Sequence, residues 1–146
     1  CTSGHELLLE LIPPKDLPQH ELTVAELVER LYHAGIRPDW WKLPPQSPAG
    51  WQALSQLIAQ HAPHCRGVIM LGLDAPLAQL SADFATAAPY AICRGFAIGR
   101  SIFAAPSRLW LAGQIDDAGF EQQIRSNYRQ LVLAWQQRHH TGASHG

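Results

Sequence analysis

Continuous runs of apolar residues recur along the chain at a spacing of roughly thirty residues, the length of one strand–helix–strand step. The runs lie within residues 6–12, 37–43, 67–74 and 90–100. The first of them is closed by Pro13 and Pro14, which cannot continue a strand ladder. Such runs are typical of strands that are buried on both faces of a parallel sheet. We therefore predict four parallel strands.

Between the strands, apolar residues follow a helical spacing. Helices are predicted over residues 23–34, 48–61, 76–84 and 106–111, and from residue 117 onward. We expect Thr23 and Glu26 to form a capping box at the start of the first helix, and Ser47 to cap the second. The predicted buried face of the last helix consists of Phe120, Ile124, Tyr128, Leu131 and Trp135.

Strands that alternate with helices predict an α/β fold with a parallel sheet, organised as (βα)4. A complete barrel of this kind needs about 250 residues. The four units of this 146-residue chain therefore correspond to half of a TIM (β/α)8 barrel. We assign residues 1–138 to the half-barrel and residues 139–146, which are small and polar, to a flexible tail. Because the chain begins with Cys1 rather than methionine, we expect a piece of a longer protein.

The composition narrows the choice of function. Hydrophobic residues make up 47% of the chain and the formal net charge is −1, so we expect a folded core and no basic surface for nucleic acid or anionic membranes. No apolar run approaches the ~18 residues of a membrane span. Cys1, Cys65 and Cys93 fit a reducing cytoplasm better than a disulfide framework. His61, His64 and Cys65 lack a fourth ligand, so we expect no metal there, and we expect no cofactor.

Polar residues stand at the ends of the predicted strands, where barrel enzymes place their chemistry. Glu10, Lys42 and Asp74 lie at or just after the first three strand ends. A lysine at the end of an apolar strand can lose its proton because desolvation disfavours the ammonium form, and a neutral amine can form a Schiff base. Alternatively, Lys42 extends its charged end into water, and Glu10 is held by an arginine or a backbone N–H.

The fourth strand passes into a glycine-bearing segment, residues 95–101, that precedes a helix. Gly95 and Gly99 would let backbone N–H groups approach an anion, and Arg100 would add a fork of donors. These three residues are the candidate phosphate site. A tight structural turn is the alternative explanation of the glycines.

Three segments, Leu8–Glu10, Asp39–Leu43 and Arg94–Phe103, together resemble the second half of a class I (Schiff-base) aldolase barrel. The nearest relatives by this resemblance are the tagatose-bisphosphate and archaeal-type fructose-bisphosphate aldolases. From His5 to Arg138 the chain is also similar to a domain of unknown function that follows the sugar kinase in bacterial myo-inositol catabolism proteins, the 5-dehydro-2-deoxygluconokinases.

This resemblance implies the C-terminal half of a barrel in which Lys42 forms the Schiff base and Glu10 transfers protons. It also implies that Gly95, Gly99 and Arg100 hold a substrate phosphate. The implied reaction cleaves 2-deoxy-5-keto-6-phosphogluconate, a phosphorylated keto sugar acid, to dihydroxyacetone phosphate and malonate semialdehyde. The implied partners are an N-terminal half-barrel and a sugar kinase domain within a longer protein.

Two other functions stay open at this point. The chain could be a non-catalytic regulatory or assembly module that keeps the barrel fold and a phosphate site, or an unrelated flavodoxin-type binding domain. A half-barrel also leaves strand edges open at Leu7–Ile12 and Tyr90–Phe96, and open edges pair with other chains. We therefore expect self-association, or pairing with the other half of the barrel, rather than a stable monomer.

Overall fold

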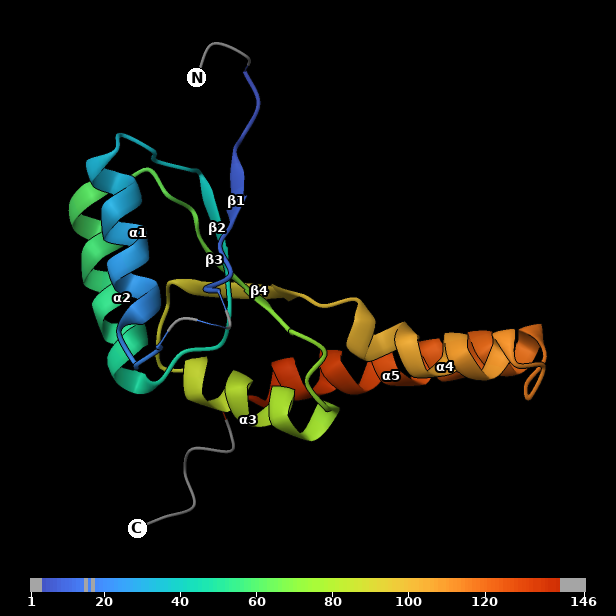
Figure 1. Cartoon of the computed structure of the whole chain (residues 1–146). Helices are drawn as coiled ribbons and strands as arrows, with labels where there is room; N and C mark the ends of the chain where they lie inside the picture. The colour runs from blue at the N-terminus through green and yellow to red at the C-terminus, as the bar shows by residue number, and fades with distance from the viewer. Residues whose placement is uncertain (1–3, 15, 17, 140–146) are drawn as a thin grey trace.

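The computed structural model describes residues 4–14, 16 and 18–139 of the chain. These residues form the four strands and five helices of Figure 1. The strands are β1 (Leu8–Glu10), β2 (Trp40–Leu43), β3 (Gly67–Leu71) and β4 (Cys93–Ala97). The helices are α1 (Thr23–His33), α2 (Pro48–His61), α3 (Leu77–Ala87), α4 (Arg100–Leu111) and α5 (Asp117–Gln137). Of the predicted tail, residues 140–146 lie outside the described residues.

The strands form one parallel sheet in the order β1-β2-β3-β4. Helices connect each strand to the next, as parallel pairing requires. In Figure 1, α1 and α2 cover one face of the sheet, and α3 and α5 lie together beside β4. The predicted α/β class and parallel (βα)4 order are confirmed, and the arrangement is that of half a barrel. None of the described helices combines the length and the hydropathy that a membrane crossing requires.

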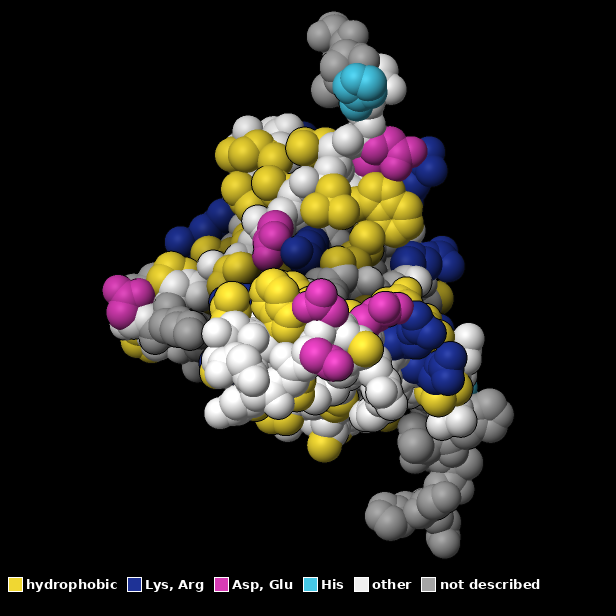
Figure 2. Space-filling model, turned by 90° about the vertical axis from the view of Figure 1, so that its right-hand side faces the viewer, with side chains coloured by type: hydrophobic (Ala, Val, Ile, Leu, Met, Phe, Trp, Pro, Cys, Tyr) yellow, Lys and Arg dark blue, Asp and Glu magenta, His cyan; other side chains and the backbone are white. Residues whose placement is uncertain are grey.

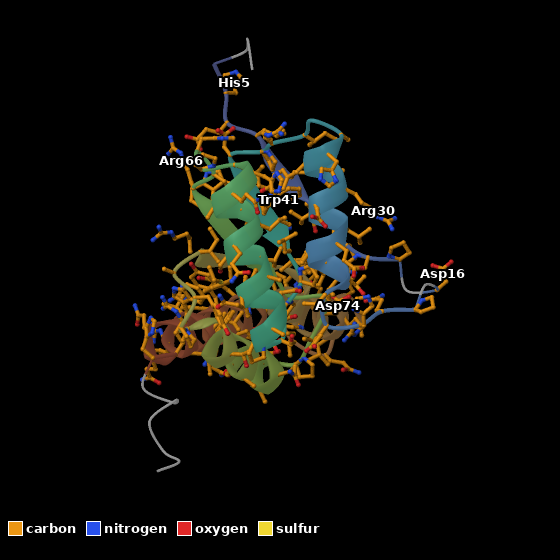
Figure 3. All side chains as sticks on the ribbon, turned by 90° about the vertical axis from the view of Figure 1, so that its left-hand side faces the viewer. His5, Asp16, Arg30, Trp41, Arg66 and Asp74 are labelled. Carbon is orange, nitrogen blue, oxygen red and sulfur yellow. The ribbon has the colours of Figure 1, made fainter. Side chains whose placement is uncertain are left out.

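Alternate residues of β2 point to opposite faces of the sheet, and this alternation separates core from site. Trp41 and Leu43 are fully buried on the face that the helices cover. Trp41 packs edge-on against Tyr32 of α1 and donates a hydrogen bond from Nε1 to the Tyr32 hydroxyl at 2.8 Å. Figure 3 shows Trp41 behind α1 and α2. Burial raises the pKa of Tyr32 to about 12. Lys42, between the two buried residues, points to the other face.

A second cluster of aromatic rings holds β4 to α3 and α5. Phe84 of α3 lies with its ring centroid 5.1 Å from that of Phe96 in β4 and 5.3 Å from that of Trp135 in α5. Phe84 is fully buried. This cluster fixes the direction in which the chain leaves β4 and enters α4.

The face of the sheet opposite α1 and α2 is uncovered, and β1 lies at the edge of the sheet. Leu7, Leu8 and Ile12 are each close to half exposed. Figure 2 shows hydrophobic side chains gathered on the upper part of this side of the molecule. The prediction that the first strand is buried on both faces is therefore wrong for the described residues, because no second layer covers it.

Local helix signals were correct at some ends and wrong at others. Ser47 caps α2 by accepting a hydrogen bond from Gly50 N–H, and Asp116 caps α5 in the same way. The capping box of α1 does not form: Thr23 is the first helical residue, and its hydroxyl accepts from His20 N–H instead. Glu26 is then free to pair with the His20 ring at 3.4 Å.

The helix expected near residue 106 begins six residues earlier, at Arg100, and contains Pro106 in its interior. Proline has no N–H to donate to the carbonyl four residues before it, here that of Ile102. Asn127 of α5 donates its side-chain N–H to this carbonyl at 2.8 Å, which explains why the helix continues. On α5, Leu131 is buried as predicted, whereas Tyr128 is largely exposed, so the predicted buried face was too wide.

Candidate functional site

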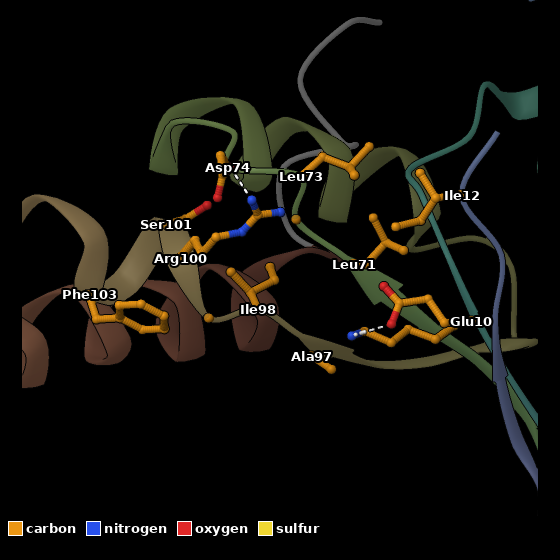
Figure 4. Close-up of a pocket in the computed structure, with 13 residues that line it drawn as sticks. Glu10, Ile12, Leu71, Leu73, Asp74, Ala97, Ile98, Arg100, Ser101 and Phe103 are labelled. Atoms are coloured by element: carbon orange, nitrogen blue, oxygen red, sulfur yellow. Dashed lines mark hydrogen bonds and ion pairs between the residues drawn. The ribbon is translucent and has the colours of Figure 1, made fainter. Parts of the chain in front are cut away.

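A cavity of about 180 Å³ lies at the carboxyl ends of the strands, on the uncovered side of the sheet. Figure 4 shows this cavity, with a dashed line marking an ion pair at each of two places on its wall. It is lined by Glu10, Ile12, Lys42, Leu71, Gly72, Leu73, Asp74, Ala97, Ile98, Gly99, Arg100, Ser101 and Phe103. Four of the predicted site residues, Glu10, Lys42, Gly99 and Arg100, are thus brought together.

The first ion pair joins Lys42 and Glu10. The two residues are direct neighbours in the register of β1 and β2, so their side chains leave the sheet on the same face. Lys42 Nζ lies 3.1 Å from Glu10 Oε2, and the two side chains are 23% and 42% exposed. Glu10 therefore finds its partner in Lys42 rather than in an arginine or a backbone N–H.

The end of β2 is fixed by local sequence. Pro44 and Pro45 follow the strand and cannot donate to a sheet ladder. Gln46 then folds back and donates its side-chain N–H to the carbonyls of both prolines, at 2.7 and 3.0 Å. Because Trp41 and Leu43 anchor β2 on the helix side, Lys42 is held on the cavity side.

The second ion pair joins Arg100 and Asp74 across the cavity wall. Arg100 is the first residue of α4, and its Nη1 lies 2.9 Å from Asp74 Oδ2. Asp74 sits in a turn after β3 that is closed by a hydrogen bond from Ala75 N–H to the Gly72 carbonyl. Leu73 and Asp74 both have positive φ, 45° and 62°, in the region that non-glycine residues seldom adopt. In Figure 4, Leu71 and Ile98 lie between the two ion pairs.

The start of α4 faces the same cavity. The Gly99 carbonyl already accepts hydrogen bonds from the N–H groups of Ile102 and Phe103. A Cβ at Gly99 would meet the Phe103 ring at 3.1 Å, so a larger residue there would push that ring. The Ser101 hydroxyl oxygen is buried and has no hydrogen-bond partner among the described residues. The first turn of a helix favours anions, which makes this rim of the cavity the anion-favouring one.

Gly95, the remaining predicted phosphate-site residue, is not brought to this cavity. It lies in the middle of β4, not in the loop that follows, and it does not line the cavity. A Cβ at this position would meet nothing within 4 Å. Conversely, Leu71, Ile98 and Phe103 line the cavity although their sequence positions carried no assigned role. Only their place beside the strand ends could have indicated them.

The two histidines and the cysteine at and just after the end of α2 contact neighbouring groups of the protein. His61 stacks on Tyr32 with ring centroids 5.5 Å apart, and the Cys65 thiol approaches the Gly67 carbonyl at 3.8 Å. Burial raises the pKa of the Cys65 thiol above its ordinary value. Over the described residues, no three histidine, cysteine, aspartate or glutamate side chains are grouped to hold a metal ion.

Comparison with known proteins bears on the family and not on the chemistry. No curated protein and no solved structure matches the chain. One protein family does match, over residues 1–139, and it is described as "Uncharacterized protein conserved in bacteria (DUF2090)". The match spans nearly the whole chain. The chain therefore belongs to the DUF2090 family of conserved bacterial proteins.

Proposed function

We propose that this chain carries the Schiff-base site of a class I aldolase-like carbon–carbon lyase. The observation that supports this most directly is the pairing of Lys42 Nζ with the Glu10 carboxylate at 3.1 Å, on the cavity at the strand ends. Imine formation needs an amine, and the carbon–carbon cleavage that follows needs a proton acceptor beside it. The resemblance to class I aldolases also implies that Lys42 is the Schiff-base residue.

The substrate we propose is 2-deoxy-5-keto-6-phosphogluconate. The Lys42 amine attacks the C5 ketone and water leaves, which gives an iminium ion. Glu10 removes the proton of the C3 hydroxyl, the C3–C4 bond breaks, and its electron pair moves into the iminium to form an enamine. Malonate semialdehyde leaves first. Protonation at C4 and hydrolysis then release dihydroxyacetone phosphate and restore Lys42.

The substrate phosphate would bind Arg100 and the N–H groups at the start of α4. Gly99 supports this role because it allows the backbone to come close to the cavity. We leave Gly95 out of the proposed phosphate site, since it lies within β4. We expect the reaction in the cytoplasm, where the thiols of Cys65 and Cys93 stay reduced.

We further propose that a second half-sheet completes the barrel. Both edges of the sheet, β1 and β4, are unpaired among the described residues. The N-terminal half-barrel of a longer protein, joined to a sugar kinase, is the partner that the resemblance implies; a second copy of the chain is the other. Light scattering at micromolar concentration tests the second possibility, and a monomer at all concentrations would contradict self-association.

Borohydride trapping tests the catalytic proposal. The chain is incubated with dihydroxyacetone phosphate and reduced, and the adduct is located by peptide mass, both for this chain and for the longer protein. The readout is simple because the sequence has only two lysines, Lys15 and Lys42. We expect an adduct that is lost in Lys42→Ala and kept in the matched control Lys15→Arg. With Glu10→Gln the adduct should persist while cleavage slows by about 10²–10⁴-fold.

The alternative is a non-catalytic phosphate-binding module. The same ion pair gives it some support, because a purely structural lysine at a strand end also pairs with a neighbouring carboxylate. Phosphate binding without any adduct on Lys42, in both the chain and the longer protein, would establish this alternative and refute the lyase proposal.

A further inference from the structure

The Asp74–Arg100 pair sits where the proposed phosphate must bind. Arg100 is the only arginine among the described residues that line the cavity, and Asp74 already occupies its guanidinium at 2.9 Å. Of the described residues, four charged ones line the cavity: Glu10, Lys42, Asp74 and Arg100. Their formal charges cancel, so the cavity attracts an anion only weakly while Asp74 stays in place.

The pair also lines two neighbouring cavities. Asp74, Arg100 and Ser101 line both the cavity of about 180 Å³ and a neighbouring one of about 390 Å³, which Arg108 also lines. Sites for small molecules usually measure about 300–1,000 Å³, so the first cavity alone is small for a phosphorylated six-carbon acid. Separation of Asp74 from Arg100 would remove one contact from the wall that the two cavities share.

The ion pair between Asp74 and Arg100 is weakly held. Both side chains are exposed, Arg100 at 64% and Asp74 at 49%, and exposed ion pairs hold weakly. Asp74 is held by a turn in which two successive non-glycine residues have positive φ, and backbone strain of this kind is concentrated at ligand clamps and switches. A phosphate dianion, with three acceptor oxygens, would engage the Arg100 guanidinium once the Asp74 carboxylate has moved away.

We propose that Asp74 is a specificity-determining residue that competes with the ligand for Arg100. In the free protein its carboxylate neutralises Arg100 and narrows the cavity; a dianionic phosphate displaces it, whereas a singly charged carboxylate does not. This proposal rests on the proposed function for the position of the phosphate. Its consequence is selection of phosphorylated substrates over unphosphorylated keto acids.

Inorganic phosphate and acetate are the probes, with affinity measured by isothermal titration calorimetry on the whole chain. Exposed pairs are worth up to about 1 kcal/mol, so Asp74→Asn should bind phosphate about fivefold more tightly than the wild type. It should also gain acetate binding. Asparagine tolerates positive φ well, so the turn should survive; Asp74→Gly is a second variant that keeps the backbone and removes the carboxylate, with folding checked by circular dichroism.

The matched control is Glu121→Gln. Glu121 forms a more exposed pair with Arg125 on α5, outside the cavity, and the substitution changes the net charge by the same amount. Its phosphate affinity should equal that of the wild type. Unchanged or weaker phosphate binding in both Asp74 variants would show that Asp74 only orients Arg100, and absence of phosphate binding in every variant would equally overturn the proposal. Because inorganic phosphate forms no imine, these results are independent of whether Lys42 is trapped.

Discussion

Replacing Lys42 with methionine should separate the chemistry of the site from the stability of the fold. Methionine keeps most of the length and apolar surface of the lysine stem and removes the ammonium group. We expect borohydride trapping to be lost completely while the free energy of unfolding changes by no more than about 1 kcal/mol in either direction. If the fold depended on the ion pair, the free energy of unfolding would fall by more than this amount.

The magnitude follows from the surroundings of the pair. Lys42 and Glu10 are 3.1 Å apart, but their side chains are 23% and 42% exposed. After the substitution Glu10 keeps its access to water, so its carboxylate is not left buried without a partner. Exposed pairs contribute about 0.2–1 kcal/mol, whereas breaking a buried pair costs about 3–5 kcal/mol.

Urea unfolding followed by circular dichroism measures the change, and Trp41→Ala provides the contrast. Trp41 is the neighbouring residue on the same strand, fully buried and hydrogen-bonded to Tyr32. Loss of this side chain should cost about 3–5 kcal/mol. A loss above about 2 kcal/mol in Lys42→Met would place the lysine among the residues that hold the sheet together and would refute this reasoning.

Four further substitutions test the packing around β3 and β4. Phe84→Ala should lower the free energy of unfolding by about 3–5 kcal/mol because it empties the fully buried centre of the aromatic cluster, whereas Tyr128→Ala, at a largely exposed position, should change it by less than about 0.5 kcal/mol. Urea unfolding midpoints measure both changes, and equal losses of stability would contradict the assigned core. Gly67→Ala should cost at least 2 kcal/mol, roughly the effect of overpacking plus backbone strain, because φ is 144° and a Cβ would lie 2.7 Å from the Ile92 carbonyl oxygen; a wild-type melting temperature would contradict this. Gly95→Ala should raise stability by about 0.5 kcal/mol and leave phosphate affinity unchanged, since alanine suits a strand interior better than glycine; weaker phosphate binding would return Gly95 to the site.

The elements that the sequence predicted correctly are those whose signals are local. The four apolar runs became the four strands, and Ser47 caps its helix. The joint position of Glu10 and Lys42 also followed from the sequence, because the carboxyl ends of parallel strands meet at one edge of a sheet.

The predictions that were wrong depended on tertiary partners. An apolar run shows that β1 can be buried, but it does not show whether a second layer is present to bury it. Pro106 led us to predict a helix start there, but it lies inside α4. The sequence could not show this, because the Asn127 side chain that satisfies the Ile102 carbonyl comes from another helix. Gly95 was predicted to lie in a phosphate-binding loop, but it lies within β4. Glycine occurs in both settings, so the residue type alone could not distinguish them.

The uncovered face leads to one more consequence for the site. Lys42 is 23% exposed with one face of the sheet open, and a second half-sheet over that face would remove water from around the cavity. Exclusion of water protects a reactive intermediate such as an imine from hydrolysis. If a complete barrel is the active form, the yield of reduced adduct per chain should therefore rise under one of two conditions. It should rise with protein concentration if two copies of the chain form the barrel. It should rise on addition of the N-terminal half-barrel if that half completes it. Adduct formation that is the same at all concentrations and unaffected by the other half would show that the half-barrel alone provides the complete site.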